Sequence, residues 1–176
     1  YYAMKGKKIQ EGASTELGST VSRMDYGQGT LMLTGNKLDL AIEGEGFFTV
    51  QTKSGNVYTR NGSFVLNKND ELVTSNGDYV LGESGAKIVI TGSNVLVNQD
   101  GTIYADENPA GKLKITAFKD PYALSRSTDG RFVDDGKAGI RNAENYKISG
   151  GYLEMSNVNA VREMTDMMEI QRTFET

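Results

Sequence analysis

Apolar and polar residues alternate in the first half of the chain, and this alternation predicts β-strands. Leu38, Leu40 and Ile42 would point to one face of an extended segment and the residues between them to the other, which is typical of a half-buried strand. Residues 44–46 (Gly-Glu-Gly) interrupt the pattern before it resumes at 47–50. Because glycine adopts backbone conformations that other residues avoid, we expect a sharp bend or bulge between two strands.

Tight-turn signals follow at short intervals and predict antiparallel hairpins. Residues 61–62 and 76–77 are both Asn-Gly, which suits a type I′ turn because both of its central residues have positive φ. Residues 100–101 (Asp-Gly) form a third signal of this kind. The segment 47–81 therefore predicts a β-meander, with a further hairpin around the third turn.

The second half of the chain contains a clear strand and a long irregular segment. Residues 112–118 alternate strictly, which predicts that Leu113, Ile115 and Ala117 point inward. We expect a strand at 87–91 and a loop at 106–111. Residues 119–145 are rich in Gly, Asp, Ser and Arg, and we expect a loop there with one short strand at Phe132-Val133.

From residue 157 the spacing of apolar residues changes to three and four, which predicts an amphipathic α-helix. The apolar face of this helix contains Val161, Met164, Met167, Met168, Ile170 and Phe174. The fold class is therefore mainly β, an antiparallel β-meander and hairpin domain with an amphipathic C-terminal α-helix. We divide the chain into an extended arm packed on the domain (1–37), a β-rich core (38–155) and the start of a C-terminal helix (156–176), and we expect both termini to be trimmed.

Composition narrows the possible chemistry. The 176 residues contain neither cysteine nor histidine, so disulfides, thiolate metal sites and histidine general bases are excluded. The net charge of −4 argues against a nucleic-acid partner, and no apolar run approaches the roughly 20 residues of a membrane-spanning helix. We expect no enzyme activity, no cofactor and no membrane insertion.

Three acidic segments have the composition of a ligand or catalytic site. Residues 67–71 lack the alternating acidic spacing of a calcium loop, and 134–136 match ordinary turn chemistry. Glu43 and Glu45 resemble a glycosidase pair only in composition, because such a pair is defined by its separation in space. We therefore expect no metal site and no catalytic residue.

Two blocks of sequence match a known pattern. The first is LDLAIEGEGFF at 38–48 followed by YTRNGSF at 58–64, and the second is GYLEMSNVN at 151–159. Together they resemble the flagellar axial proteins, the family of bacterial basal-body rod proteins and the hook protein. The positions that carry the resemblance are Leu38, Gly44, Gly46, Phe47, Phe48, Tyr58, Thr59, Arg60, Gly62, Phe64, Ser156, Asn157, Val158 and Asn159.

The resemblance implies a structural subunit that is exported through the flagellar secretion apparatus and assembles helically into the basal-body rod, which transmits torque. The implied partners are further copies of the chain and neighbouring rod and hook proteins, with the predicted helix as the assembly surface and the isolated fragment monomeric. The absence of proline from 1–37 and the turn at 82–85 favour the proximal rod protein, whereas 169–172 resembles the distal one. A β-rich bacterial surface or carbohydrate-binding module remains the alternative.

Overall fold

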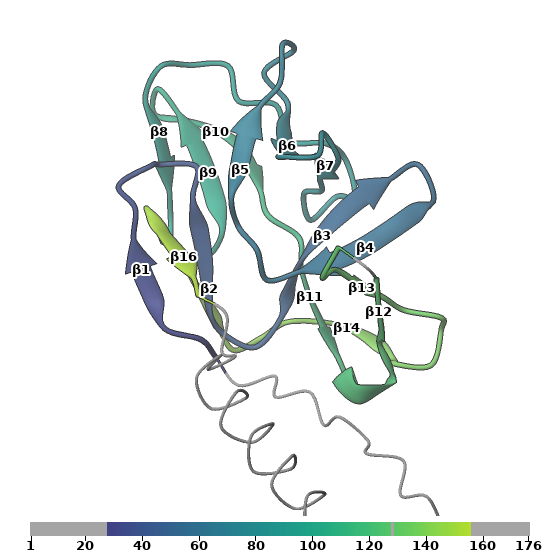
Figure 1. Cartoon of the computed structure of the whole chain (residues 1–176). Coiled ribbons are helices and arrows are strands. Elements are labelled where there is room, and N and C mark those ends of the chain that lie inside the picture. Colours follow the sequence, from purple (N-terminus) through teal and green to yellow (C-terminus); the bar gives the residue numbers. More distant parts are fainter. Residues whose placement is uncertain (1–27, 128, 156–176) are drawn as a thin grey trace, which may run out of the picture.

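The computed structural model describes residues 28–127 and 129–155 (Figure 1). These residues form antiparallel β-structure with a single 3₁₀ turn, η1 (Pro121–Ala123). In chain order the strands are β1 (Leu31–Leu33), β2 (Leu40–Gly44), β3 (Phe47–Thr52), β4 (Gly55–Thr59), β5 (Phe64–Leu66), β6 (Leu72–Thr74), β7 (Tyr79–Val80), β8 (Val95–Val97), β9 (Thr102–Ala105), β10 (Asn108–Lys112), β11 (Ile115–Phe118), β12 (Ser125–Arg126), β13 (Phe132–Val133), β14 (Ile140–Asn142), β15 (Tyr146–Gly150) and β16 (Tyr152–Glu154).

Strand β3 is the centre of the largest sheet, whose order is β12-β13-β4-β3-β7-β6-β5. One edge of β3 pairs with β4, and the other edge pairs first with β11 and then with β7. Strand β14 extends this sheet beyond β11. Three smaller sheets complete the domain: β10-β9-β8, β15-β2 and β1-β16.

Two hydrophobic clusters pack against opposite faces of β3. Phe48 belongs to the larger cluster, in which its ring meets Phe64 edge to face with centroids 5.0 Å apart. Phe47 belongs to the smaller cluster, with Tyr58 and Phe118. Adjacent residues of a strand point to opposite faces, so one Phe-Phe pair supplies both clusters. Phe47, Phe48 and Tyr58 are all buried.

Several predicted turns are confirmed. The bend at 44–46 separates β2 from β3, and both of its glycines have positive φ, 95° at Gly44 and 118° at Gly46. Residues 76–77 connect the paired strands β6 and β7, and residues 100–101 connect β8 and β9, so both hairpins are confirmed. The predicted type I′ geometry is wrong, because in each pair only the glycine has positive φ, 84° at Gly77 and 85° at Gly101. The mainly antiparallel β fold class is confirmed, whereas the predicted C-terminal helix lies outside the described residues.

The Asn-Gly pair at 61–62 does not form the predicted hairpin. The strands on either side of it, β4 and β5, are separated in the sheet by β3, β7 and β6. Gly62 has no positive φ; instead its carbonyl accepts a hydrogen bond from Leu40 N at 3.0 Å. A Cβ at this position would lie 1.7 Å from the Leu40 carbonyl oxygen, so glycine is needed here for a close backbone approach.

The prediction that β2 is half buried is also wrong. Leu40, Ala41 and Ile42 are all fully buried, because β16 packs beside β2 and covers a face that the alternation assigned to solvent. The predicted strand at 87–91 makes only isolated bridges, through Lys87 and Val89.

The strand predicted at 112–118 is divided between two sheets. Strand β10 ends at Lys112 and pairs with β9, whereas β11 begins at Ile115 and pairs with β3 and β14. Leu113, Ile115 and Ala117 are buried as predicted, but Phe118 is buried too because the smaller cluster lies on the other face.

Two segments predicted as loops contain more strand than expected. Residues 108–112 form β10 despite Pro109, which is tolerated because β10 is an edge strand with a register shift after that residue. The segment 119–145 contains β12 and β14 besides the predicted strand at Phe132-Val133. These strands are held by long-range pairing, which local sequence patterns do not reveal.

Candidate functional site

The candidate functional site is the end of the domain where the first and last described residues meet. Strands β1 and β16 pair antiparallel with Leu31 opposite Glu154, and Met155 N donates a hydrogen bond to Thr30 O at 2.9 Å. A Cβ on Gly29 would lie 2.0 Å from the Met155 carbonyl oxygen. The two chain ends of the described domain are therefore in direct backbone contact.

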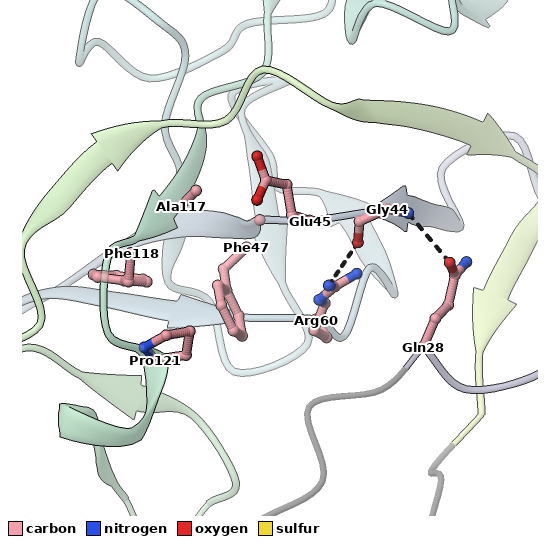
Figure 2. A pocket seen from close by; sticks show the side chains of 9 residues that line it. Gln28, Gly44, Glu45, Phe47, Arg60, Ala117, Phe118 and Pro121 are labelled. Atoms are coloured by element: carbon pink, nitrogen blue, oxygen red, sulfur yellow. Dashed lines mark hydrogen bonds between the residues drawn. The ribbon is translucent and has the colours of Figure 1, made fainter.

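Arg60 reaches this end of the domain from the segment that follows β4. Its guanidinium donates hydrogen bonds to the carbonyl oxygens of Ile42 at 3.2 Å and Gly44 at 2.7 Å (the second bond is drawn in Figure 2). It also lies 5.4 Å from the ring centroid of Phe47, a distance at which a cation is attracted by an aromatic ring. Burial lowers the pKa of Arg60, and the nearby Glu154 carboxylate opposes that shift.

Glu154 connects Arg60 to the N-terminal side of the site. One carboxylate oxygen lies 3.5 Å from Arg60 Nη1, and the other accepts a hydrogen bond from Gly29 N at 2.9 Å. The Glu154 side chain is only 10% exposed. Its Oε2 has no hydrogen-bond partner among the described residues, so the Arg60 charge is its only described compensation.

Gln28 completes the connection to β2. Its side-chain oxygen accepts a hydrogen bond from Gly44 N at 3.2 Å, and its amide nitrogen donates to Ile42 O at 3.5 Å. Figure 2 shows Gln28 and Arg60 approaching Gly44 from two sides. The end of β2 is therefore bound by residues that lie 16 positions before and 16 positions after Gly44 in the chain.

A pocket of about 340 Å³ lies between these polar contacts and the smaller hydrophobic cluster (Figure 2). Phe47, Phe118 and Pro121 form its apolar wall, and Gln28 and Arg60 contribute polar groups. Both terminal nitrogens of the Arg60 guanidinium already face a carbonyl or a carboxylate. We therefore regard the pocket as a surface beside the polar contacts and assign it no ligand.

Glu45 lies at the tip of the bend between β2 and β3 and binds Arg141 of β14. The guanidinium donates to both carboxylate oxygens, at 3.0 and 2.6 Å. These hydrogen bonds are the main cause of a lowered Glu45 pKa, which desolvation partly offsets. Both side chains are 37% exposed, so solvent and salt weaken the pair.

Within residues 28–127 and 129–155, no helix is long and apolar enough to cross a bilayer. The same residues contain no group of three or more acidic side chains arranged to hold a metal ion. The polar groups gathered at this end of the domain hold backbone segments together, and their arrangement provides positioning rather than reaction chemistry.

Comparison with known proteins identifies the family. Residues 41–105 match the family described as the flagellar hook protein FlgE/F/G D1 domain, and residues 149–176 match the C-terminal family of the flagellar basal body rod FlgEFG proteins. The flagellar basal-body rod protein FlgG of Agrobacterium fabrum is 32% identical over 95% of this chain and 69% of its own length. This chain belongs to the flagellar basal-body rod protein family. Its members are structural proteins of the flagellar axis and not enzymes.

Other rod proteins are similar to about the same degree. FlgF of Caulobacter vibrioides is 34% identical over 86% of the chain and 63% of its own length, and FlgG of Bacillus subtilis is 31% identical over 91% and 67%. The chain thus spans about two thirds of the length of these rod proteins. Because both FlgG and FlgF are similar to it, the family membership does not decide between members of the rod.

The rod-family motif residues that the structure describes, 38–64, fall into three structural roles. Phe47, Phe48, Tyr58 and Phe64 are buried in the two clusters, and Leu38 packs partly buried against the larger one. Gly44, Gly46 and Gly62 occupy the bend and the close backbone approach. The third role is polar contact with the backbone. Arg60 donates to the carbonyl oxygens of Ile42 and Gly44, and the hydroxyl of its neighbour Thr59 accepts a hydrogen bond from Asn61 N.

Sequence reasoning missed the partners of Arg60. Gln28 and Glu154 lie far from it in the sequence, and no local pattern signals that they meet. The N-terminal part of the arm (1–27), the assembly residues from Val161 to Phe174 and the motif residues 156–159 lie outside the described residues.

Proposed function

We propose that this chain is the β-domain of a subunit of the proximal flagellar rod, which self-assembles into a helical shaft that transmits motor torque to the hook and filament. The observation that carries this proposal is the pairing of β1 with β16. This pairing places the two chain connections, the points at residues 28 and 155 where the chain enters and leaves the described domain, at one end. A domain attached through one end can project from a tube built by the flanking segments without interrupting it.

The assembly surface in this proposal is the apolar face of the predicted C-terminal helix. Its partners are other copies of the chain and neighbouring rod and hook proteins. The spacing of Val161, Met164 and Met168 supports this assignment, because an amphipathic helix with a methionine-rich face adapts to a helical partner. Export would follow the flagellar secretion route.

The proximal position rests on the N-terminal sequence. Residues 1–37 contain no proline, so the proline-glycine insert that marks the distal rod protein is not evident. The turn at 82–85 also favours the proximal protein; it is closed by a hydrogen bond from Gly85 N to Gly82 O at 2.8 Å. Complementation tests this choice: the full gene should restore swimming to a strain lacking the proximal rod protein and not to one lacking the distal protein.

A pair of adjacent substitutions tests the assembly surface. Met164→Asp in the full-length protein should abolish motility and polymer formation, whereas Thr165→Asp introduces the same charge on the polar face of the predicted helix and should leave both intact. Light scattering after size exclusion measures the polymers, and circular dichroism checks that the β-domain is folded. Normal swimming of the Met164→Asp strain would contradict the proposal.

The carbohydrate-binding alternative gains no support from the part of the chain that the structure describes. A carbohydrate-binding module would need aromatic side chains gathered on one concave face. Among the described residues, the exposed tyrosines Tyr122 and Tyr152 lie on separate elements, η1 and β16, and neither lines the pocket. We do not propose this function.

A further inference from the structure

We propose that Arg60 is a positioning residue that holds residues 28–29 and 154–155 against the end of β2, and that subunit assembly depends on the spacing it sets between the two chain connections. The assembly part of this inference rests on the proposed function above. The contacts themselves join four segments that are distant in sequence: Arg60 binds Ile42 O, Gly44 O and Glu154, and Glu154 binds Gly29 N.

The β1–β16 ribbon is weak by itself, so the contacts of Arg60 and Glu154 matter for its position. We call these contacts the tie. Each strand has three residues and pairs only with the other, and an isolated two-stranded ribbon is at best marginally stable in water. Met32 is 46% exposed and Leu33 67% exposed, so β1 buries little apolar surface. Polar contacts to the rest of the domain therefore add to the packing of β16 beside β2 in keeping the ribbon in place.

The guanidinium has the geometry that this role requires. Its planar group presents donors in several fixed directions, so one side chain can bind two carbonyl oxygens and face a carboxylate at the same time. A lysine ammonium is a single point of charge on a flexible chain and cannot reproduce this arrangement. The ring of Phe47 beneath the guanidinium limits its movement further.

The location of the ion pair argues for positioning over stability of the core. Arg60 and Glu154 are 22% and 10% exposed, and burying two charges costs much of the energy that their attraction returns. Neither residue belongs to the hydrophobic clusters. The pair links residue 154 to Arg60, which in turn binds the carbonyl oxygen of residue 44.

Hydrogen exchange on the 176-residue chain tests the tie. In Arg60→Met, which keeps most of the aliphatic volume, protection of amides in 29–33 and 152–155 should fall roughly ten- to a hundred-fold, while β6 and β9 keep their protection. Arg131→Met is the matched control, because Arg131 is 21% exposed and also pairs with two carboxylates, Asp78 and Asp129, away from the chain ends. Unchanged protection of β1 and β16 in Arg60→Met would overturn the proposal.

A second pair of variants separates position from folding. Glu154→Gln keeps an acceptor for Gly29 N and removes the charge that faces Arg60, so it should give a smaller loss of protection confined to the same strands. Arg60→Lys keeps the positive charge but loses the planar guanidinium with its several donors, and we expect it to lose as much protection as Arg60→Met. Full rescue by lysine would overturn the role of the guanidinium geometry.

Polymer formation by the full-length protein tests the second half of the inference. Arg60→Met should slow polymerisation at least about ten-fold under conditions where Arg131→Met polymerises normally and both domains are folded. Wild-type polymerisation by Arg60→Met would overturn the dependence of assembly on Arg60. Failure of the unmutated protein to polymerise would contradict the proposed function instead, and the exchange measurements would still decide whether the tie exists.

Discussion

The two faces of β3 bury adjacent phenylalanines in different ways. Phe48 is fully buried in a mostly aliphatic cluster drawn from strands along the whole domain, such as Leu40, Leu72 and Ile148. Phe47 packs in a smaller aromatic cluster, where its ring meets Phe118 and Phe132 at centroid distances of 5.8 and 5.2 Å. One face is covered by regular strands, the other by the irregular segment that follows β11.

The difference shows that the clusters on the two faces of one strand can contribute unequally to the stability of the domain. The Phe48 face joins β2, β5, β6 and β9, so its loss should unfold the domain as a unit. The Phe47 face is covered by residues from 121–127 and 129–138, which have little regular structure of their own, so its loss should open that segment first. The following substitutions test this contrast.

The largest effect should come from Phe48→Ala. It removes a fully buried ring and its contact with Phe64, which should lower the free energy of unfolding by about 3 to 5 kcal/mol. Urea denaturation followed by circular dichroism measures the change. A loss below about 1 kcal/mol would show that the Phe48 face is not the main core.

Gly62→Ala should come next, because it forces apart two backbones on the Phe48 face. The new Cβ would lie 1.7 Å from Leu40 O and 3.1 Å from the Phe48 ring, and we expect a loss of about 2 to 4 kcal/mol. Gly77→Ala is the control for backbone strain alone: Gly77 has φ +84° and open space around it, so about 1 kcal/mol should be lost. Equal losses in the two variants would contradict the close approach at Gly62.

Phe47→Ala should destabilise the domain by about 2 to 3 kcal/mol, less than Phe48→Ala, because the smaller cluster can collapse around the missing ring. Hydrogen exchange should show the main loss of protection in β12 and β13 while β6 and β9 stay protected. Uniform loss of protection across all strands would show that the two faces unfold together and would remove the contrast between them.

The Phe47 face also contains a buried polar pair, which gives a smaller and reversible effect. The hydroxyls of Thr49 and Thr116 are 2.8 Å apart, and both residues are almost fully buried. Thr49→Val should cost about 1 to 2 kcal/mol because it leaves the other hydroxyl unpaired, and adding Thr116→Val should recover most of that loss. Additive losses in a double-mutant cycle would mean that the two hydroxyls are not coupled.

The smallest effect should be that of Glu45→Gln, at the bend between β2 and β3. Arg141 lowers the pKa of Glu45 in the folded state, so the carboxylate contributes stability above its unfolded pKa, near 4.3, and loses it as pH falls through the lower folded value. We expect about 0.5 kcal/mol or less at pH 7, vanishing at low pH and in high salt. A difference between wild type and variant that persists at pH 2 would contradict this cause.

The sequence alone determined the features that depend on neighbouring residues. Alternation located β2, β3 and β11, and the Asn-Gly and Asp-Gly pairs located the turns at 76–77 and 100–101, because strand pleating and the left-handed conformation of a turn glycine are local properties. The rod-family motifs were recognisable for the same reason.

Tertiary structure decided the features in which distant segments meet. Gly62 is glycine because the Leu40 backbone passes against it, and β2 is buried on both sides because β16, over 100 positions later, lies beside it. The tie between Arg60 and Glu154 has the same origin. Contacts of this kind depend on how the sheets pack in three dimensions. The residues near a side chain in the sequence do not indicate which distant residue it will contact.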